Sequence, residues 1–351
     1  MMKTIKKEYI MAGTTVILWS TLPSVSKLII NELSPMSATF YASLIAAVTL
    51  LVINLIRGGA GFYKVYKLHD YARIACMGFL GLFCYTSLYY LGLSRLTSQI
   101  AGIINYMWPI MIVLFSCIIL RERLTGRKLA AMLISFSGMI IICAQGLFGG
   151  GESFSRIGMV CCFLAAVCYG IYSAFNKKYD YDQWIVLNVA FAVTALFSGA
   201  YCAISDDFGT LSPSMIPGLL WIGIFVNAIA YVLWGMAVNQ GETARISILA
   251  YICPFLSLIF GRLLLDEHIS MSALAGLVFI VGGVFVQMDL RGRENRFVYR
   301  FAHRSADCYA DCLADDLANR LADSPAERPA RKLSQIEFFM PLTIVLCTNW
   351  A

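Results

Sequence analysis

The chain of 351 residues is too apolar for an ordinary water-soluble domain. Hydrophobic residues make up 59% of the sequence, charged residues only 14%, and the mean hydropathy is +0.73, whereas soluble domains are about half apolar and a quarter charged. The net charge of +6 does not indicate nucleic-acid binding, because the basic residues form short clusters between apolar stretches. The composition therefore predicts an integral membrane protein, with the lipid bilayer as its main solvent.

Segments of about 20 apolar residues are long enough to cross the hydrocarbon core of a bilayer as helices. The sequence holds ten, so we predict an all-α fold with ten transmembrane helices. The first segment is too long for a signal peptide and lacks a cleavage site, so we interpret it as a retained helix. The predicted spans are Tyr9 to Ile30, Pro35 to Ile56, Tyr71 to Leu93, Leu96 to Leu120, Leu129 to Leu147, Ile157 to Phe175, Trp184 to Ile204, Pro213 to Val238, Ile246 to Leu265 and Met271 to Met288.

Basic residues are concentrated in alternate connections between these spans, and cytoplasmic loops are the ones that collect Lys and Arg. One side has fourteen of them before the tail, whereas the other side has only Lys27, Arg95, Arg156 and Arg262. This asymmetry predicts that both termini are cytoplasmic, which requires an even number of helices. The fourteen are Lys3, Lys6, Lys7, Arg57, Lys64, Lys67, Arg73, Arg121, Arg123, Arg127, Lys128, Lys177, Lys178 and Arg245.

The sequence repeats itself at a nearly constant offset. Tyr106, Pro109, Glu122 and Gly138 recur 145 positions later as Tyr251, Pro254, Glu267 and Gly283, and Gly81, Tyr85 and Tyr89 align with Gly223, Asn227 and Tyr231 at an offset of 142. We therefore predict two homologous five-helix repeats, residues 1–150 and 151–290, followed by a cytoplasmic tail, 291–351, whose mixed charge and prolines indicate disorder.

Five is an odd number of helices, so the second repeat has to enter the membrane from the opposite side. Inverted repeats are typical of carriers that work by alternating access, in which a shared site near the bilayer midplane opens to either side. The pattern predicts two inverted repeats around a central cavity, a monomeric transporter and a small-molecule substrate.

Metal, cofactor and enzyme chemistry find little support in the sequence. Most cysteines lie in apolar runs, and the CxxxC of Cys308 and Cys312 has no accompanying ligand set. A membrane-embedded transferase would gather acidic groups and histidines near an interface, but His69, His268 and His303 are scattered. We expect no metal, no cofactor and no enzymatic activity.

Three prolines lie inside predicted spans, where proline frees a backbone carbonyl and bends the helix. They are Pro23, Pro109 and Pro254. Pro109 and Pro254 are equivalent in the two repeats, so we predict that this pair acts as a hinge or gate, with a purely structural kink as the alternative for each proline.

Polar and aromatic residues cluster near these prolines and are the candidate solute-binding residues. Uncharged hydrogen-bonding groups beside aromatic walls suit an organic solute of mixed polarity. The alternative for each is a structural role in helix packing or at the membrane interface; for the group beside Pro109 we favour solute binding. The candidates are Trp19, Ser20, Ser24, Tyr85, Tyr89, Asn105, Tyr106, Trp108, Tyr169, Tyr172, Asn227 and Tyr231, with Tyr251 as the repeat counterpart of Tyr106.

The apolar spans contain no Asp or Glu near the expected midplane, where proton-driven carriers commonly keep a carboxylate. This favours facilitated diffusion or exchange. Glu267 and Glu122 fall at helix ends, where we expect pairing with bases or helix N-termini, and Lys27 also lies near a helix end, from which its side chain can extend to the interface.

Several motifs together resemble the drug/metabolite transporter superfamily, and within it the EamA-type carriers, closest to the aromatic amino acid exporters. The motifs are LWST from Leu18, NYMWP from Asn105, RERLTG from Arg121 and FNKKY from Phe175. The resemblance implies export across a bacterial inner membrane through a cavity lined by helices one, three, four, six, eight and nine, with Trp108 in the wall and Tyr106 beside it.

One position departs from that resemblance. The exporter branch usually has a tryptophan on the sixth helix where this chain has Cys168, so we include Cys168 among the binding residues and expect a reshaped pocket. The substrate is therefore either an amino acid or related metabolite, or a drug-like amphipathic solute.

Overall fold

The computed structural model describes residues 7–121, 126, 129–130, 132–134, 136–138, 140–141, 155–179, 181–240, 249–267 and 271–287. These residues form helices and connecting turns only. Seven helical segments in this part of the chain are long and apolar enough to cross a membrane, and two further apolar helices are shorter, Cys253–Leu265 and Leu274–Gly283. The prediction of an all-helical protein with several membrane-length apolar helices is confirmed, and the predicted number of ten stays a prediction.

The first repeat contains helix α1 (Lys7–Ile30), α2 (Pro35–Gly58), the 3₁₀ segment η1 (Gly59–Lys64), α3 (Leu68–Gly78), the π-helical segment η2 (Phe79–Cys84), α4 (Tyr85–Leu93), α5 (Ser98–Asn105) and α6 (Trp108–Ile119). The second contains α8 (Arg156–Tyr179), α9 (Gln183–Ser205), α10 (Ile216–Leu220), the π-helical η3 (Trp221–Ile229), α11 (Ala230–Gln240), the 3₁₀ segment η4 (Ala250–Ile252), α13 (Cys253–Leu265) and α14 (Met271–Gln287).

Two predicted helices differ from continuous rods. The span predicted from Leu96 to Leu120 is two helices, α5 and α6, which are separated at Tyr106 and Met107. Pro109 is the reason, because proline has no backbone N–H to bond the carbonyl four residues earlier and its ring clashes with that turn. The predicted eighth span likewise contains the π-helical segment η3.

Local backbone features recur in the two repeats at the offsets seen in the sequence. The π-helical segments η2 and η3 begin at Phe79 and Trp221, which are 142 positions apart. Helices α6 and α13 begin at Trp108 and Cys253, 145 positions apart, and each has proline as its second residue. The homologous blocks therefore share backbone geometry as well as residue types.

A third pair of equivalent positions has the rare left-handed backbone conformation. Arg121 follows α6 with φ of 56° and Asp266 follows α13 with φ of 53°, again 145 positions apart. Non-glycine residues seldom adopt positive φ, so its occurrence at both positions supports the alignment of the two repeats.

Helices α2 and α9 pack against each other along their length and run antiparallel. Near the C-terminal end of α2, Asn54 Nδ2 donates to Trp184 O at the start of α9 (3.1 Å). At the N-terminal end of α2, Ser34 Oγ donates to Asp207 Oδ2 just after α9 (2.6 Å). Asn188 of α9 bonds the carbonyl of Ala47 in between (2.8 Å).

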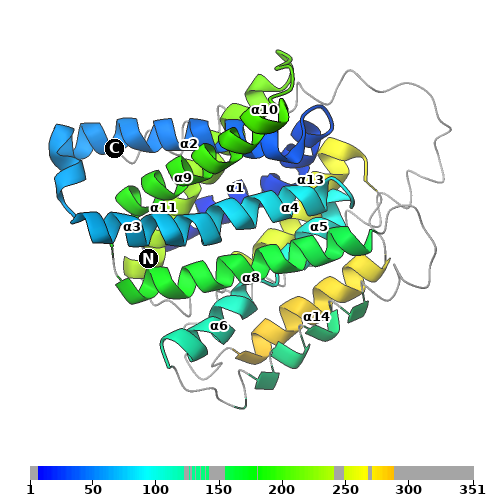
Figure 1. Cartoon of the computed structure of the whole chain (residues 1–351). Helices are drawn as coiled ribbons and strands as arrows, with labels where there is room; N and C mark the ends of the chain where they lie inside the picture. Colours follow the sequence, from blue (N-terminus) through cyan, green and yellow to red (C-terminus); the bar gives the residue numbers. More distant parts are fainter. Residues whose placement is uncertain are drawn as a thin grey trace, which may run out of the picture. The chain divides into compact units, whose positions relative to one another are not determined.

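Further helix pairs connect the two repeats in an exchanged pattern. Helix α1 of the first repeat packs against α11 and α13 of the second, and α8 of the second packs against α4 and α6 of the first. Figure 1 shows α8 between α4 and α6. Since α1 and α8 are equivalent helices, the same packing arrangement is formed twice with the repeats interchanged.

Some predictions fall outside the described residues. The tail, Glu122 and the side chain of Tyr251 are among them. About half of the predicted fifth span also lies outside, its described positions are helical, and Gly138 within it approaches Gly276 and Ile280 of α14.

Candidate functional site

A chamber lies among α1, α4, α5, α6, α8 and α11, so both repeats contribute to its wall. Its cavity volume is about 30 Å³, which is room for about two water molecules. No charged side chain lines it among the residues that the structure describes. The lining residues are Trp19, Leu22, Pro23, Tyr85, Tyr89, Gly102, Asn105, Tyr106, Trp108, Tyr169 and Tyr231.

Aromatic rings from both repeats meet around Trp19 and Trp108. These two rings lie 6.0 Å apart between centroids at an interplanar angle of 84°. Tyr231 and Trp234 of the second repeat lie 5.1 and 5.3 Å from Trp19, and Tyr169 lies 5.5 Å from Trp108. Edge-to-face packing of this kind holds rings in fixed orientations, so the chamber has a defined aromatic wall.

Several polar atoms in the chamber wall are buried without a partner. Within the described part of the chain, nothing bonds Trp19 Nε1, Tyr89 OH or Asn105 Oδ1, although these three side chains are at most 8% exposed. Burying a polar group without a hydrogen bond is costly. The residues that carry these atoms line the chamber and are therefore candidate partners for a bound solute.

The position of Asn105 follows from its local sequence. Thr97 caps the N-terminus of α5 through its hydroxyl, which accepts from Ile100 N (3.3 Å), and the helix ends at Asn105 because of Pro109. Asn105 Nδ2 donates to Tyr85 OH (3.2 Å). This bond uses the amide nitrogen and leaves the amide oxygen of this chamber residue without a partner among the described residues.

The structure brings together eight of the predicted binding residues and Pro23 in the chamber wall. Tyr172 is buried behind it, 6.0 Å from the Tyr169 ring, and Ser20 instead bonds the carbonyl of Val16 (2.6 Å). Ser24 and Asn227 are buried elsewhere. The eight are Trp19, Tyr85, Tyr89, Asn105, Tyr106, Trp108, Tyr169 and Tyr231.

Cys168 lies outside this wall. It is half-buried and close to Cys84 of η2, and it is its chain neighbour Tyr169 that reaches the chamber. Cys168 and Tyr169 differ in this way because successive helical residues point in directions about 100° apart, and the expected effect of Cys168 on the pocket stays a prediction. Pro109 and Pro254, the predicted hinge pair, are buried in the first turns of α6 and α13.

Sequence reasoning missed Leu22 and Gly102, which also line the chamber. Gly102 is four residues before Tyr106 and three before Asn105, so helical spacing could have indicated it. Leu22 resembles any lipid-facing leucine in sequence, and only its place beside Pro23 could have drawn attention to it.

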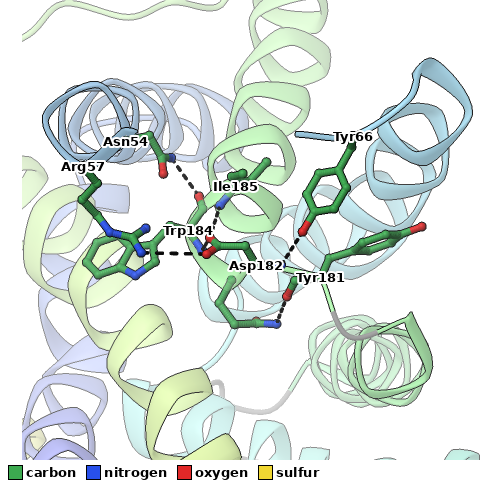
Figure 2. Close-up of polar contacts among 8 residues, drawn as sticks. Asn54, Arg57, Tyr66, Tyr181, Asp182, Trp184 and Ile185 are labelled. Carbon is green, nitrogen blue, oxygen red and sulfur yellow. Dashed lines mark hydrogen bonds and ion pairs between the residues drawn. The ribbon is translucent and has the colours of Figure 1, made fainter. Parts of the chain in front are cut away.

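One end of the helices holds a polar cluster joining the repeats, which we name the Arg57 end: Arg57, Tyr66, Asp70, Arg73, Tyr181 and Asp182. Figure 2 shows part of it. Asp182 Oδ1 caps α9 by accepting from Trp184 N and Ile185 N (2.9 and 3.2 Å). Asp182 N donates to Tyr66 OH (2.8 Å), and the Arg57 guanidinium lies 3.8 Å from the Asp182 carboxylate and over the Trp184 ring.

The same cluster continues through Tyr181. Its hydroxyl donates to Asp70 Oδ1 (2.8 Å) and accepts from Arg73 Nη1 (2.8 Å). Partial burial and the bond to Asp70 raise the pKa of Tyr181 above its ordinary value, so the hydroxyl keeps its proton at neutral pH. Tyr181 thus connects α3 of the first repeat to the segment preceding α9.

At the opposite end of α2, a second cluster joins the repeats, which we name the Lys27 end: Lys27, Ser98, Gln99 and Glu267. The carboxylate of Glu267 accepts from Ser98 N, Ser98 Oγ and Gln99 N (2.8, 2.8 and 3.1 Å). Glu267 therefore caps the N-terminus of α5, where the helix dipole favours negative charge. A helix N-terminus was one of the partners predicted for this residue.

Lys27 was expected to extend to the interface, and this stays a prediction. Its ammonium donates to the carbonyls of Leu93 and Leu96 (both 2.7 Å). Leu93 ends α4, where carbonyls lack helical partners and carry the negative end of the dipole, and Leu96 lies in the turn that follows. The lysine therefore ties α1 to the turn between α4 and α5.

The fold and the chamber define a multi-pass membrane protein with an internal, uncharged, aromatic site. The sequence profile of the EamA-like transporter family matches the chain twice, over residues 6–144 and 156–288. The chain belongs to the EamA-like transporter family, and the resemblance seen in the motifs is confirmed.

Curated relatives are described as transporters. An uncharacterized transporter of Archaeoglobus fulgidus is 25% identical over 290 residues, covering 81% of this chain and all of the relative. The aromatic amino acid exporter YddG of Ancylobacter novellus is 27% identical over 252 residues, covering 70% of this chain and 84% of that protein. A probable amino-acid metabolite efflux pump of Escherichia coli is 24% identical, covering 49% of this chain and 62% of the pump.

A solved crystal structure shares the fold. It matches with a TM-score of 0.61 and 23% identity, covering 80% of this chain and 97% of that chain.

Proposed function

We propose that this protein exports amino acids or related small metabolites across the bacterial inner membrane by alternating access. The observation that carries the proposal is the uncharged, ring-lined chamber whose wall combines Trp19 and Trp108 of one repeat with Tyr169 and Tyr231 of the other. A site shared between two mobile halves can open toward either side when the halves tilt. The protein acts as a monomer with ten transmembrane helices.

The antiparallel packing of α2 and α9 supports an inverted arrangement. These are the second helices of their repeats, and opposite directions are what inversion requires. The exchanged packing of α1 and α8 agrees with a two-fold relationship between the halves. Arg57, Lys177 and Lys178 lie in the last turns of α2 and α8, on the side with most basic residues, which supports a cytoplasmic Arg57 end and cytoplasmic termini.

The Arg57 end and the Lys27 end are suited to act as gates. Each holds hydrogen bonds between the repeats, and opening the chamber toward one side requires breaking the bonds at that end while the other end stays closed. Tyr181 with Asp70 serves this role at the Arg57 end, and Glu267 with Ser98 serves it at the Lys27 end. The chamber opens alternately to the two sides when the hydrogen bonds of the Arg57 end and those of the Lys27 end break one set at a time.

The relatives and the chamber chemistry support an amino acid-like solute. Two of the similar proteins are described as exporting aromatic amino acids or amino-acid metabolites. Aromatic walls cover an apolar side chain, and the unpaired groups of Trp19, Tyr89 and Asn105 can bond a polar backbone. The lack of a carboxylate in the wall favours facilitated diffusion or exchange over proton coupling.

A second candidate is efflux of drug-like amphipathic solutes, which the predominance of rings in the wall favours. Flux into proteoliposomes separates the two. If the protein exports amino acids, exchange of labelled amino acids should be saturable, and unlabelled amino acids should reduce it by competition. Drug efflux predicts that only bulky amphipathic compounds compete, and absence of flux for both classes would overturn the proposal.

A further inference from the structure

We propose that the chamber selects its solute by an ammonium group, so that amines lacking a carboxylate are ligands as good as amino acids. This inference rests on the proposed function and specifies its substrate class. The ammonium site consists of Asn105 and the rings of Trp19, Trp108 and Tyr231, three of the four being no more than 8% exposed and Tyr231 9%.

Asn105 offers a side-chain acceptor that no described group uses. Its amide nitrogen is engaged by Tyr85 OH (3.2 Å), and its Oδ1 is buried without a partner within the described part of the chain. Its backbone carbonyl also lacks the usual helical donor, because the residue four positions later is Pro109. An ammonium has three donors and no acceptor, which complements this arrangement.

The end of α5 adds a favourable field. Helix α5 ends at Asn105, and the C-terminal end of a helix carries partial negative charge from its unpaired carbonyls. Pro23 has the same effect in α1, where it removes the helical donor to the carbonyl of Trp19. Two residues of the chamber wall, Asn105 and Trp19, therefore have carbonyls without their usual helical donor, and no basic side chain lines the chamber among the described residues.

The rings supply the remaining attraction. Trp19, Trp108 and Tyr231 meet edge to face, with centroids 5.1 to 6.0 Å apart for the pairs that Trp19 forms, so their faces point in different directions. A cation within about 6 Å of such a face is attracted by the ring quadrupole, most strongly for tryptophan and away from water. A carboxylate gains nothing from these faces and depends on wall donors such as Trp19 Nε1 and Tyr89 OH.

Three ligands with the same ring test the inference directly. The full-length protein in detergent is titrated with 2-phenylethylamine, phenylalanine and 3-phenylpropionate, and dissociation constants are taken from the rise in melting temperature. We expect the amine and the amino acid to bind within about tenfold of one another, and the acid about tenfold or more weaker, since one charge-assisted hydrogen bond and one ring contact each contribute on that scale. Equal binding of the acid, or failure of the amine to bind, would overturn the inference.

Two substitutions of one residue sharpen the test. Asn105→Leu removes the acceptor and should weaken 2-phenylethylamine about tenfold, whereas Asn105→Asp adds a negative charge and should tighten it at least about threefold. Asn188→Leu is the matched control, because Asn188 is a buried asparagine that bonds Ala47 away from the chamber. An unchanged affinity in both Asn105 variants contradicts the site; if they do not fold, the ligand order of the wild-type protein still decides.

The proposed function and the ammonium preference can be disproved independently of each other. Saturable flux of phenylalanine with the wrong ligand order would remove only the ammonium preference. Correct ligand order without flux of any solute would leave the binding site and remove the transport role.

Discussion

The carboxylate of Glu267 lies 2.8 Å from the backbone nitrogen of Ser98 and caps helix α5, although the two residues belong to different repeats. A helix capped by a distant segment couples the folding of one element to the docking of another. Here the coupled elements are the end of α13 and the broken helix that carries Asn105 and Trp108 into the chamber.

The first prediction follows from this contact. Glu267→Gln removes the charge that satisfies Ser98 and Gln99 and should destabilise the protein by about 1–3 kcal/mol, which lowers its melting temperature by several degrees. Hydrogen exchange should increase selectively at the first turn of α5. Glu32→Gln is the control, because Glu32 is exposed near the same end; equal effects of both substitutions would contradict the capping role.

A second prediction concerns the opposite end. Tyr181→Phe removes the bonds to Asp70 and Arg73 without altering the ring, so we expect faster hydrogen exchange in the first turn of α9 and the start of α3, with α5 unaffected. Exchange mass spectrometry measures both regions in one experiment. Tyr201→Phe, at an exposed position of α9, should change neither, and a uniform increase across the molecule would argue against two separate gates.

Trp108 provides the third prediction. Trp108→Ala should reduce transport at least about tenfold, because the ring contributes about 1–2 kcal/mol to a solute held against it, while insertion into the membrane stays intact. Transport is measured as initial flux at equal amounts of reconstituted protein. Trp108→Phe keeps a ring and should retain part of the rate.

The fourth prediction tests the packing behind the chamber. A Cβ on Gly170 of α8 would lie 2.5 Å from Met111 Cβ and 2.7 Å from the Met111 carbonyl carbon, so Gly170→Ala has to push α6 and α8 apart and should cost about 1–3 kcal/mol. Gly13→Ala meets no atom within 4 Å in α1 and should be neutral or stabilising by up to about 1 kcal/mol. Melting temperatures of the two variants in detergent decide the matter, and similar values would contradict the close approach of α6 and α8.

Apolar segments predicted the helices because span length is a property of the bilayer that each segment satisfies on its own. The repeat was visible in the sequence because Pro109 and Pro254 occupy equivalent positions, and a proline interrupts helical hydrogen bonding in the same way in either repeat. The π-helical segments at Phe79 and Trp221 were not predictable, since no residue type marks where a helix takes up an extra residue per turn.

Only some of the chamber residues could be predicted from the sequence. Trp19, Asn105 and Trp108 stood out as polar or large groups beside prolines, and the structure places them together. Ser20 and Cys168 looked equivalent in sequence, but which side of a helix faces the chamber depends on how α1 and α8 rotate against their neighbours. That rotation is set by packing between segments far apart in the chain.

Counterflow in proteoliposomes tests the central claim most directly. Vesicles with reconstituted protein are loaded with unlabelled phenylalanine, and uptake of labelled phenylalanine is followed for the wild-type protein and for Trp108→Ala. The account predicts saturable uptake above that of protein-free vesicles by the wild-type protein, reduced at least about tenfold in the variant. Uptake no greater than in protein-free vesicles, or equal rates in both proteins, would contradict a solute path through this chamber.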